Sequence, residues 1–152
     1  MTILMDHLIS WMIAVPILGI AILAFTRDEE SIRRIALGVT MVNVLLSLIL
    51  CTSFDLSLQG MQFVERVQWM PTFNIQYAVG VDGISILMVM LTVLLCPLCV
   101  LCSWTGIKTR VRAFLSLILL VEGAMIVVFT ALDLFLFFML WELTMIPMYF
   151  MI

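Results

Sequence analysis

The chain has 152 residues, of which 65% are hydrophobic and 11% are charged, and its mean hydropathy is +1.29. Soluble domains contain about 45–50% apolar and about 25% charged residues, so this composition is typical of a protein embedded in a lipid bilayer. With seven Lys and Arg residues and a formal net charge of -3, the chain lacks the basic surface that a nucleic-acid backbone requires, which excludes nucleic acid as a partner.

Five apolar stretches are long enough to cross the bilayer, because a membrane-spanning helix needs about 20 mostly apolar residues. We predict these helices at residues 4–25, 35–54, 81–102, 114–130 and 132–152. The connection between the last two is so short that they must be antiparallel neighbours. The sequence therefore predicts an all-α membrane protein in which the whole chain, residues 1–152, forms a single transmembrane domain.

Positive charge is distributed unevenly, and this predicts the orientation, since cytoplasmic loops of membrane proteins are rich in Lys and Arg. The basic residues that flank the connections after the first and third predicted helices are Arg27, Arg33, Arg34, Lys108, Arg110 and Arg112. Arg66 alone lies in the long connection between the second and third helices. We expect that long connection and the N-terminus on the outer side of the membrane, and the C-terminal end on the inner side.

The long connection, residues 55–80, contains a strand pattern. Apolar residues at every second position from Phe73 to Val79 predict one strand. Residues 64–69 form a weaker candidate strand, and Pro71 between the two favours a turn. The predicted extramembrane β-hairpin would either offer an edge strand to a neighbouring subunit or lie as a lid over the helix ends.

Two acidic residues fall near the middle of the bilayer. Glu122 lies about ten residues, or about 15 Å of helix, beyond Arg112, and Glu142 lies about nine residues beyond Asp133. A carboxylate at that depth costs roughly 2.5–3.5 kcal/mol, so it needs a role or a partner. Burial favours the neutral acid and a nearby cation favours the charged form, so a movable partner could load and unload a proton. We predict proton translocation as the role of Glu122 and Glu142.

A simpler interpretation is that each glutamate is neutral and only forms a hydrogen bond across a helix interface. Pro147 favours the functional interpretation for Glu142, because it removes an amide donor and predicts a kink just beyond the acid. Irregular backbone at membrane depth is tolerated where it is buried in protein or lines a wet cavity. A kink that serves only packing is the alternative.

Two further acids are expected to cap helices. Asp133 directly precedes the fifth helix, and Asp82 stands with Ser85 at the start of the third, where a carboxylate accepts hydrogen bonds from free amides. No pattern predicts a cofactor or metal site in this chain. A single histidine, His7, gives no pair of haem ligands, and the Cys96 to Cys102 run lacks the fourth cysteine of an iron–sulfur motif.

Three stretches resemble one family: residues 79–85 (VGVDGIS), the pair Glu122-Gly123, and residues 135–149 (FLFFMLWELTMIPMY). Together they resemble subunit M, or chain 4, of respiratory NADH:quinone oxidoreductase (complex I), an antiporter-like and proton-translocating family. The last stretch is long and specific, whereas the first is shared with sister antiporter-like subunits. The resemblance extends over essentially the whole chain.

This resemblance implies a membrane-arm subunit of an enzyme complex that moves protons outward, driven by NADH oxidation and quinone reduction. It implies that NADH, FMN, iron–sulfur clusters and quinone are used elsewhere in the complex, with no redox centre in this chain. The implied partners are other membrane-arm subunits and the lipid of a bacterial cell membrane or, alternatively, of the mitochondrial inner membrane. Glu142 matches the family's fifth-helix glutamate, which pairs with a lysine on a later helix, and Glu122 resembles an auxiliary fourth-helix acid.

The sequence departs from the family pattern because it contains no intramembrane lysine, since Lys108 lies in a loop. We therefore interpret the chain as the N-terminal third of a longer antiporter-like subunit. Two other interpretations stay open. The chain could belong to an Mrp-type cation/proton antiporter or a membrane-bound hydrogenase, which resemble this family, or it could be a scaffold that anchors partner subunits without transporting ions.

Overall fold

The structure is a computed structural model that describes residues 7–152 other than residues 56, 59 and 74. Within these residues, five helices are long and apolar enough to cross a membrane. They are α2 (Leu8–Phe25), α3 (Glu29–Ser53), α4 (Ser85–Gly106), α5 (Val111–Thr130) and α6 (Leu134–Met151). The predicted fold class is confirmed, and the chain is an integral membrane protein. Residues 4–6 of the predicted first helix lie outside the described part.

Helices α3 and α4 begin furthest from the residues expected from hydropathy, whereas α5 begins at Val111, not 114, and α6 at Leu134, not 132. Helix α3 starts at Glu29, not near residue 35, because the side chain of Asp28 accepts a hydrogen bond from the Ser31 amide at 2.8 Å and forms an N-cap. The hydrogen bond from Ser31 also lowers the pKa of the Asp28 carboxyl. Helix α4 starts at Ser85, not at residue 81, because Val81 still belongs to strand β2 (Ile75–Val81) and residues 82–84 form a turn.

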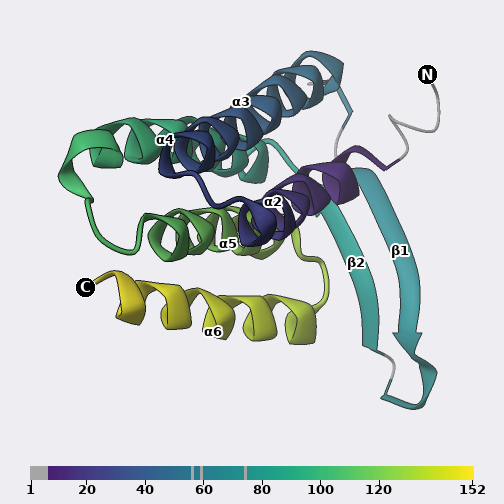
Figure 1. Ribbon diagram of the computed structural model, residues 1–152. Helices are drawn as coiled ribbons and strands as arrows, with labels where there is room; N and C mark the ends of the chain where they lie inside the picture. Colours follow the sequence, from purple (N-terminus) through teal and green to yellow (C-terminus); the bar gives the residue numbers. More distant parts are fainter. Residues whose placement is uncertain (1–6, 56, 59, 74) are drawn as a thin grey trace.

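Helix α5 lies at the centre of the bundle, in contact with the other four long helices (Figure 1). In the most apolar 18-residue window of each helix, 56% of the residues are buried in α5 but only 17% in α6. Apolar clusters surround α5 at both ends of the bundle. The protein therefore surrounds α5 almost completely and leaves α6 on the outside.

Small residues allow the helices around α5 to approach closely. A Cβ atom at Gly19 of α2 would lie 2.8 Å from the side chain of Val39 in α3 and 3.1 Å from that of Leu119 in α5. Small residues at such contacts are typical of membrane helices, whose association depends on close packing because lipid is as apolar as the helices themselves. Gly19 therefore marks the point where three helices converge.

The long connection forms the predicted antiparallel hairpin, of strand β1 (Gln62–Met70), a short 3-10 turn (Pro71–Phe73) and strand β2 (Ile75–Val81). It projects from one end of the bundle (Figure 1). The last four residues of β2 are buried, and the backbone amide of Leu132, between α5 and α6, donates to the carbonyl of Ala78 at 2.8 Å. Strand β2 is thus attached to the bundle, and β1 is the free edge of the two-stranded sheet.

A buried glutamate on β1 fastens the hairpin to the first turn of α2. Glu65 is only 6% exposed, and its carboxylate accepts hydrogen bonds from the backbone amide of Ser10 at 3.2 Å and from the Ser10 hydroxyl at 2.5 Å. The Nδ1 atom of His7 lies 3.1 Å from the same carboxylate, and the hydroxyl of Tyr77 on β2 lies 2.9 Å from that of Ser10. Burial raises the pKa of Tyr77. Because α2 has no side-chain cap of its own, Glu65 caps it from the hairpin.

We expect Glu65→Ala to loosen the hairpin, because a buried hydrogen-bond donor left without its partner costs about 1–3 kcal/mol. Amide hydrogen exchange in β1 and β2 should become about tenfold faster or more, as measured by mass spectrometry. Glu30→Ala is the matched control, since Glu30 forms an exposed ion pair with Arg34 and such pairs contribute about 0–1 kcal/mol. Unchanged exchange in the strands of Glu65→Ala would show that the cap does not hold the hairpin.

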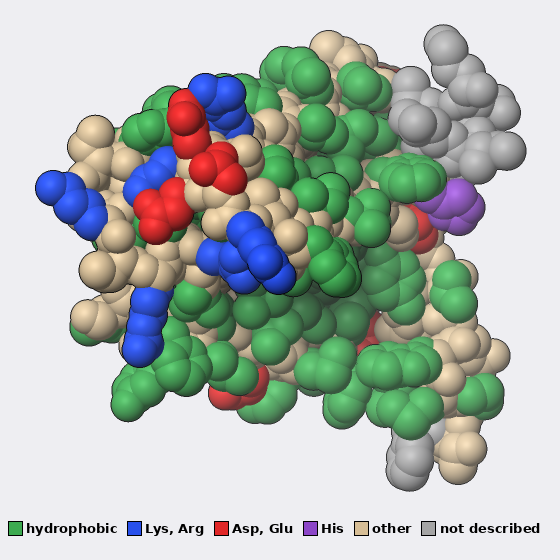
Figure 2. All heavy atoms as spheres, in the orientation of Figure 1, with side chains coloured by type: hydrophobic (Ala, Val, Ile, Leu, Met, Phe, Trp, Pro, Cys, Tyr) green, Lys and Arg blue, Asp and Glu red, His purple; other side chains and the backbone are tan. Residues whose placement is uncertain are grey.

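The basic residues at the helix connections gather at the end of the bundle away from the hairpin (Figure 2). Arg27, Arg110 and Arg112 line one surface hollow there, which brings the two basic connections together. The guanidinium of Arg33 donates to the carbonyls of Trp104 and Ile107 at the end of α4. The basic connections thus lie at one end of the bundle, and from the charge pattern we expect this end to face the cytoplasm.

This orientation predicts the labelling of single cysteines in a background without the four native ones. A membrane-impermeant maleimide should label Thr72→Cys, in the exposed hairpin turn, from outside sealed cells. Thr109→Cys, in the exposed connection between α4 and α5, should react only after permeabilisation. Labelling of Thr109→Cys in intact cells would contradict the predicted orientation.

Candidate functional site

Glu122 lies in the centre of the bundle, about midway along α5, and is 0% exposed. Its Oε1 atom accepts a hydrogen bond from Nδ2 of Asn43 in α3 at 3.1 Å. Among the described residues, its Oε2 atom has no hydrogen-bond partner, and neither does Oδ1 of Asn43, which is also fully buried. Charged groups are almost never fully buried unless they are paired, so this arrangement requires a specific chemical account.

Sequence reasoning missed Asn43, although a signal was present. It is the one amide side chain in α3, within a mostly apolar stretch, and polar side chains at that depth pair with one another. Thr40 and Ser47 lie on the same buried face of the helix. Their hydroxyls donate to the α3 carbonyls of Leu37 and Val44, so neither donates to Glu122.

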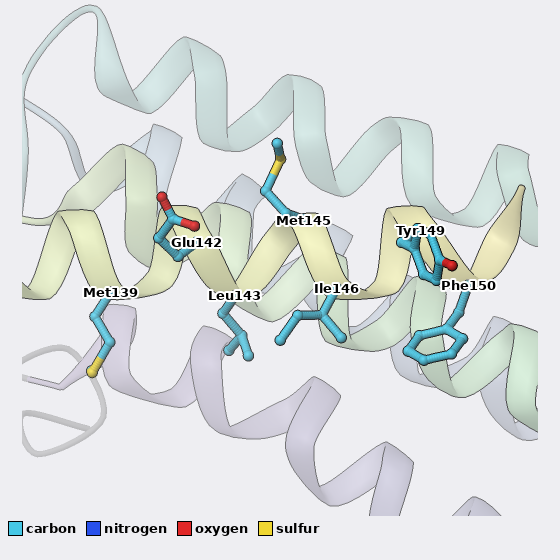
Figure 3. A pocket seen from close by; sticks show the side chains of 7 residues that line it. All are labelled: Met139, Glu142, Leu143, Met145, Ile146, Tyr149 and Phe150. Atoms are coloured by element: carbon cyan, nitrogen blue, oxygen red, sulfur yellow. The ribbon is translucent and has the colours of Figure 1, made fainter.

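Glu142 has very different surroundings. It is exposed on α6, on a shallow hollow of about 550 Å³ that α6 alone forms. The lining residues are Met139, Glu142, Leu143, Met145, Ile146, Tyr149 and Phe150, and Figure 3 shows that all of these side chains come from the one helix. Glu142 is therefore a single carboxylate on an apolar and uncovered helix face.

The two glutamates do not form a pair among the described residues. Glu122 is directed from α5 toward Asn43 of α3, whereas Glu142 lies on the open side of α6. The ion pairs of the described residues involve other groups, His7 with Glu65 and Arg34 with Glu30. Each acid therefore depends on a different set of neighbours.

Pro147 lies within α6, which remains helical up to Met151. Together with Leu136 and Thr144 it belongs to the buried face of α6, which packs on α5. The hydroxyl of Thr144 donates to the carbonyl of Trp141 at 2.7 Å, one turn earlier. The proline and the acid Glu142 thus lie on different faces of the same helix.

The two expected capping acids are at helix starts. Asp133 is the N-cap of α6, and its carboxylate accepts hydrogen bonds from the amides of Phe135 and Leu136 at 2.9 and 3.0 Å. Asp82 accepts hydrogen bonds from the amide of Ser85 at 2.7 Å and from its hydroxyl at 2.8 Å. These hydrogen bonds lower the pKa of the Asp82 carboxyl. Asp133 thus caps α6 directly, whereas Asp82 stabilises the turn that leads into α4, whose N-cap residue is Ile84.

A match to a family model identifies the family of this chain. A model described as NADH-ubiquinone oxidoreductase chain 4, amino terminus, matches residues 10–137. The chain belongs to this family. The chain 4 match contains the whole of α3 and α5 and the first turn of α6. It therefore includes both Asn43 and Glu122. The family resemblance seen in the sequence is thereby confirmed.

Individual relatives agree with the chain 4 assignment. The chain is 40% identical to NADH-quinone oxidoreductase subunit M of Rhodobacter capsulatus, a match covering 97% of this chain and 30% of the relative. It is 39% identical to NADH-ubiquinone oxidoreductase chain 4 of Arabidopsis thaliana, covering 95% and 30%. The NAD(P)H-quinone oxidoreductase chain 4 of Parasynechococcus marenigrum is 38% identical, covering 93% and 26%. The chain therefore spans less than a third of the length of these relatives.

We expect Asp133→Ala to destabilise the start of α6 by about 0.5–2 kcal/mol, because the first amides of a helix then lose their cap. Amide exchange at Phe135 and Leu136 should become faster, as followed by hydrogen-exchange mass spectrometry. Asp133→Asn is the matched control, since Asn caps helices about as well as Asp. Equal exchange in the alanine and asparagine variants would contradict the capping role.

Proposed function

We propose that this chain is part of the membrane arm of an NADH:quinone oxidoreductase and takes part in proton translocation coupled to NADH oxidation and quinone reduction. The observation that carries the proposal is the presence of carboxyl groups at membrane depth on two adjacent helices of a chain 4 family member, one buried and one exposed. Acidic residues in such positions are costly and are typical of proton pathways.

Glu142 is the residue to which we assign proton exchange with the rest of the protein. Its carboxylate stands on an apolar surface, and a charge there is costly unless a partner covers it. The relatives continue for more than twice the length of this chain, so their further segments have the length to supply that cover. A cation brought against Glu142 would favour release of its proton, and removal of the cation would favour uptake.

We propose that the redox centres of the complex lie in other subunits. Among the described residues, no group of three or more His, Cys, Asp and Glu side chains is arranged to hold a metal ion. NADH, FMN, iron–sulfur clusters and quinone would then act at a distance from this chain. In this proposal the chain contributes a path for protons.

The β1 edge of the hairpin supports the assignment of other membrane-arm subunits as partners. The edge is unpaired in the two-stranded sheet, and it carries the exposed apolar side chains of Val64, Val67 and Trp69. An exposed strand of this kind is suited to pairing with a strand of another chain. A scaffold that only anchors partners would use the same edge, so the hairpin alone does not distinguish scaffold from transporter.

The Glu142→Gln variant, in the full-length subunit of the assembled complex, distinguishes a proton-translocating subunit from a scaffold. A positioned acid or base typically accelerates proton transfer by about 10²–10⁴-fold, so translocation through this subunit should fall to a small fraction. The measurement is NADH-driven proton uptake in vesicles, with NADH oxidation by the redox subunits recorded in parallel. Glu142→Asp should retain translocation, and Tyr149→Phe on the same face of α6 is the control. Normal uptake in Glu142→Gln would favour the scaffold.

A further inference from the structure

The pair formed by Glu122 and Asn43 leaves two oxygen atoms unpaired. The bond between Asn43 Nδ2 and Glu122 Oε1 uses one atom of each side chain. The remaining atoms, Glu122 Oε2 and Asn43 Oδ1, are the buried side-chain nitrogen or oxygen atoms without a partner in the described part of the chain. Both are acceptors when Glu122 is ionised, so neither can satisfy the other. A single proton on Glu122 Oε2 would turn that atom into a donor for Asn43 Oδ1.

Within the described part of the chain, the groups around Glu122 do not offer a compensating positive charge. Helix α2 contains no titratable residue, and the charged residues of α3 end at Arg34, about 14 Å along the helix from Asn43. The titratable groups of α4 are cysteines, of which Cys96 lies close enough to interact with Glu122 electrostatically. On α6 the titratable residues are Glu142 and Tyr149, and both are exposed. An ionised Glu122 would thus be a buried charge for which the described residues supply no counterion.

We propose that Asn43 holds Glu122 in its neutral form as a cyclic acid–amide pair. In this pair Asn43 Nδ2 donates to Glu122 Oε1, and the protonated Oε2 of Glu122 donates to Asn43 Oδ1. An amide suits this task because it carries one donor group and one acceptor on the same planar end, as a carboxylic acid does. One proton then satisfies both unpaired oxygens and removes the buried charge.

In this pair Glu122 would store a proton for the translocation proposed above, and this role rests on that proposed function. When the proton leaves Oε2, the hydrogen bond from Nδ2 remains, but Asn43 Oδ1 loses its donor and the charge stays in an apolar site. Release therefore requires a new positive charge or a water molecule beside Glu122. Asn43 is a positioning residue that keeps the proton on Glu122 until such a change occurs.

The test is infrared spectroscopy on the assembled complex with the full-length subunit. A protonated carboxyl gives a C=O stretching band above the amide I band, whereas a carboxylate does not. We expect a band at neutral pH that Glu122→Gln removes and that shifts in deuterated water. Glu122→Gln is nearly isosteric and keeps an oxygen for Asn43 Nδ2, so this comparison does not depend on a disruptive variant.

Asn43→Leu tests the partner. It should shift the Glu122 band to higher frequency, because the buried carboxyl stays protonated but loses both hydrogen bonds. Ser47→Ala, on the same buried face of α3, is the matched control and should leave the band in place. Absence of a band that Glu122→Gln removes would overturn the proposal in favour of an ionised carboxylate with a bridging water. A band that Asn43→Leu leaves unchanged would overturn the assignment of Asn43. Neither result bears on Glu142, whose test is proton uptake.

Discussion

Within the hydrocarbon of a bilayer every polar group must find its partner inside the protein, and α5 is the helix on which this requirement acts most strongly. It is enclosed by the other four long helices, and it carries Glu122 at its most buried point. Asn43 of α3 provides the hydrogen-bonding group that the acid needs there. The close approach of α2, α3 and α5 at Gly19 shows how tightly the same three helices exclude lipid and water.

Helix α6 is packed against the rest of the protein on only one side, so only that side can find polar partners within the bundle. Leu136, Thr144 and Pro147 are buried against the bundle, while large apolar residues such as Phe138 and Ile146 remain exposed. Lipid satisfies such apolar side chains, but it does not satisfy the carboxylate of Glu142 on that same outer surface. The contrast between the two acids therefore arises from their positions in the bundle, since both stand in apolar helices of similar length.

The sequence alone was sufficient to predict the helices and the hairpin, because hydropathy and period-two alternation are local properties. It placed the start of α3 several residues too late, since a charged first turn held by the Asp28 cap lowers local hydropathy without ending the helix. The partner of Glu122 could not be predicted in this way. Asn43 lies on another helix, 79 positions away in the sequence, and only packing brings the two together.

The hairpin is attached to the turn between the two acid-bearing helices. The backbone of β2 is bonded to the turn between α5 and α6, through the Leu132 amide and a bridge between Val79 and Ala131. Strand β1 is fastened to the start of α2 through Glu65. A displacement of the hairpin by a neighbouring subunit would therefore strain hydrogen bonds at the turn that fixes α6 relative to α5. Glu122 and Glu142 lie on either side of that turn, so the hairpin is attached to the backbone that joins the two acid-bearing helices.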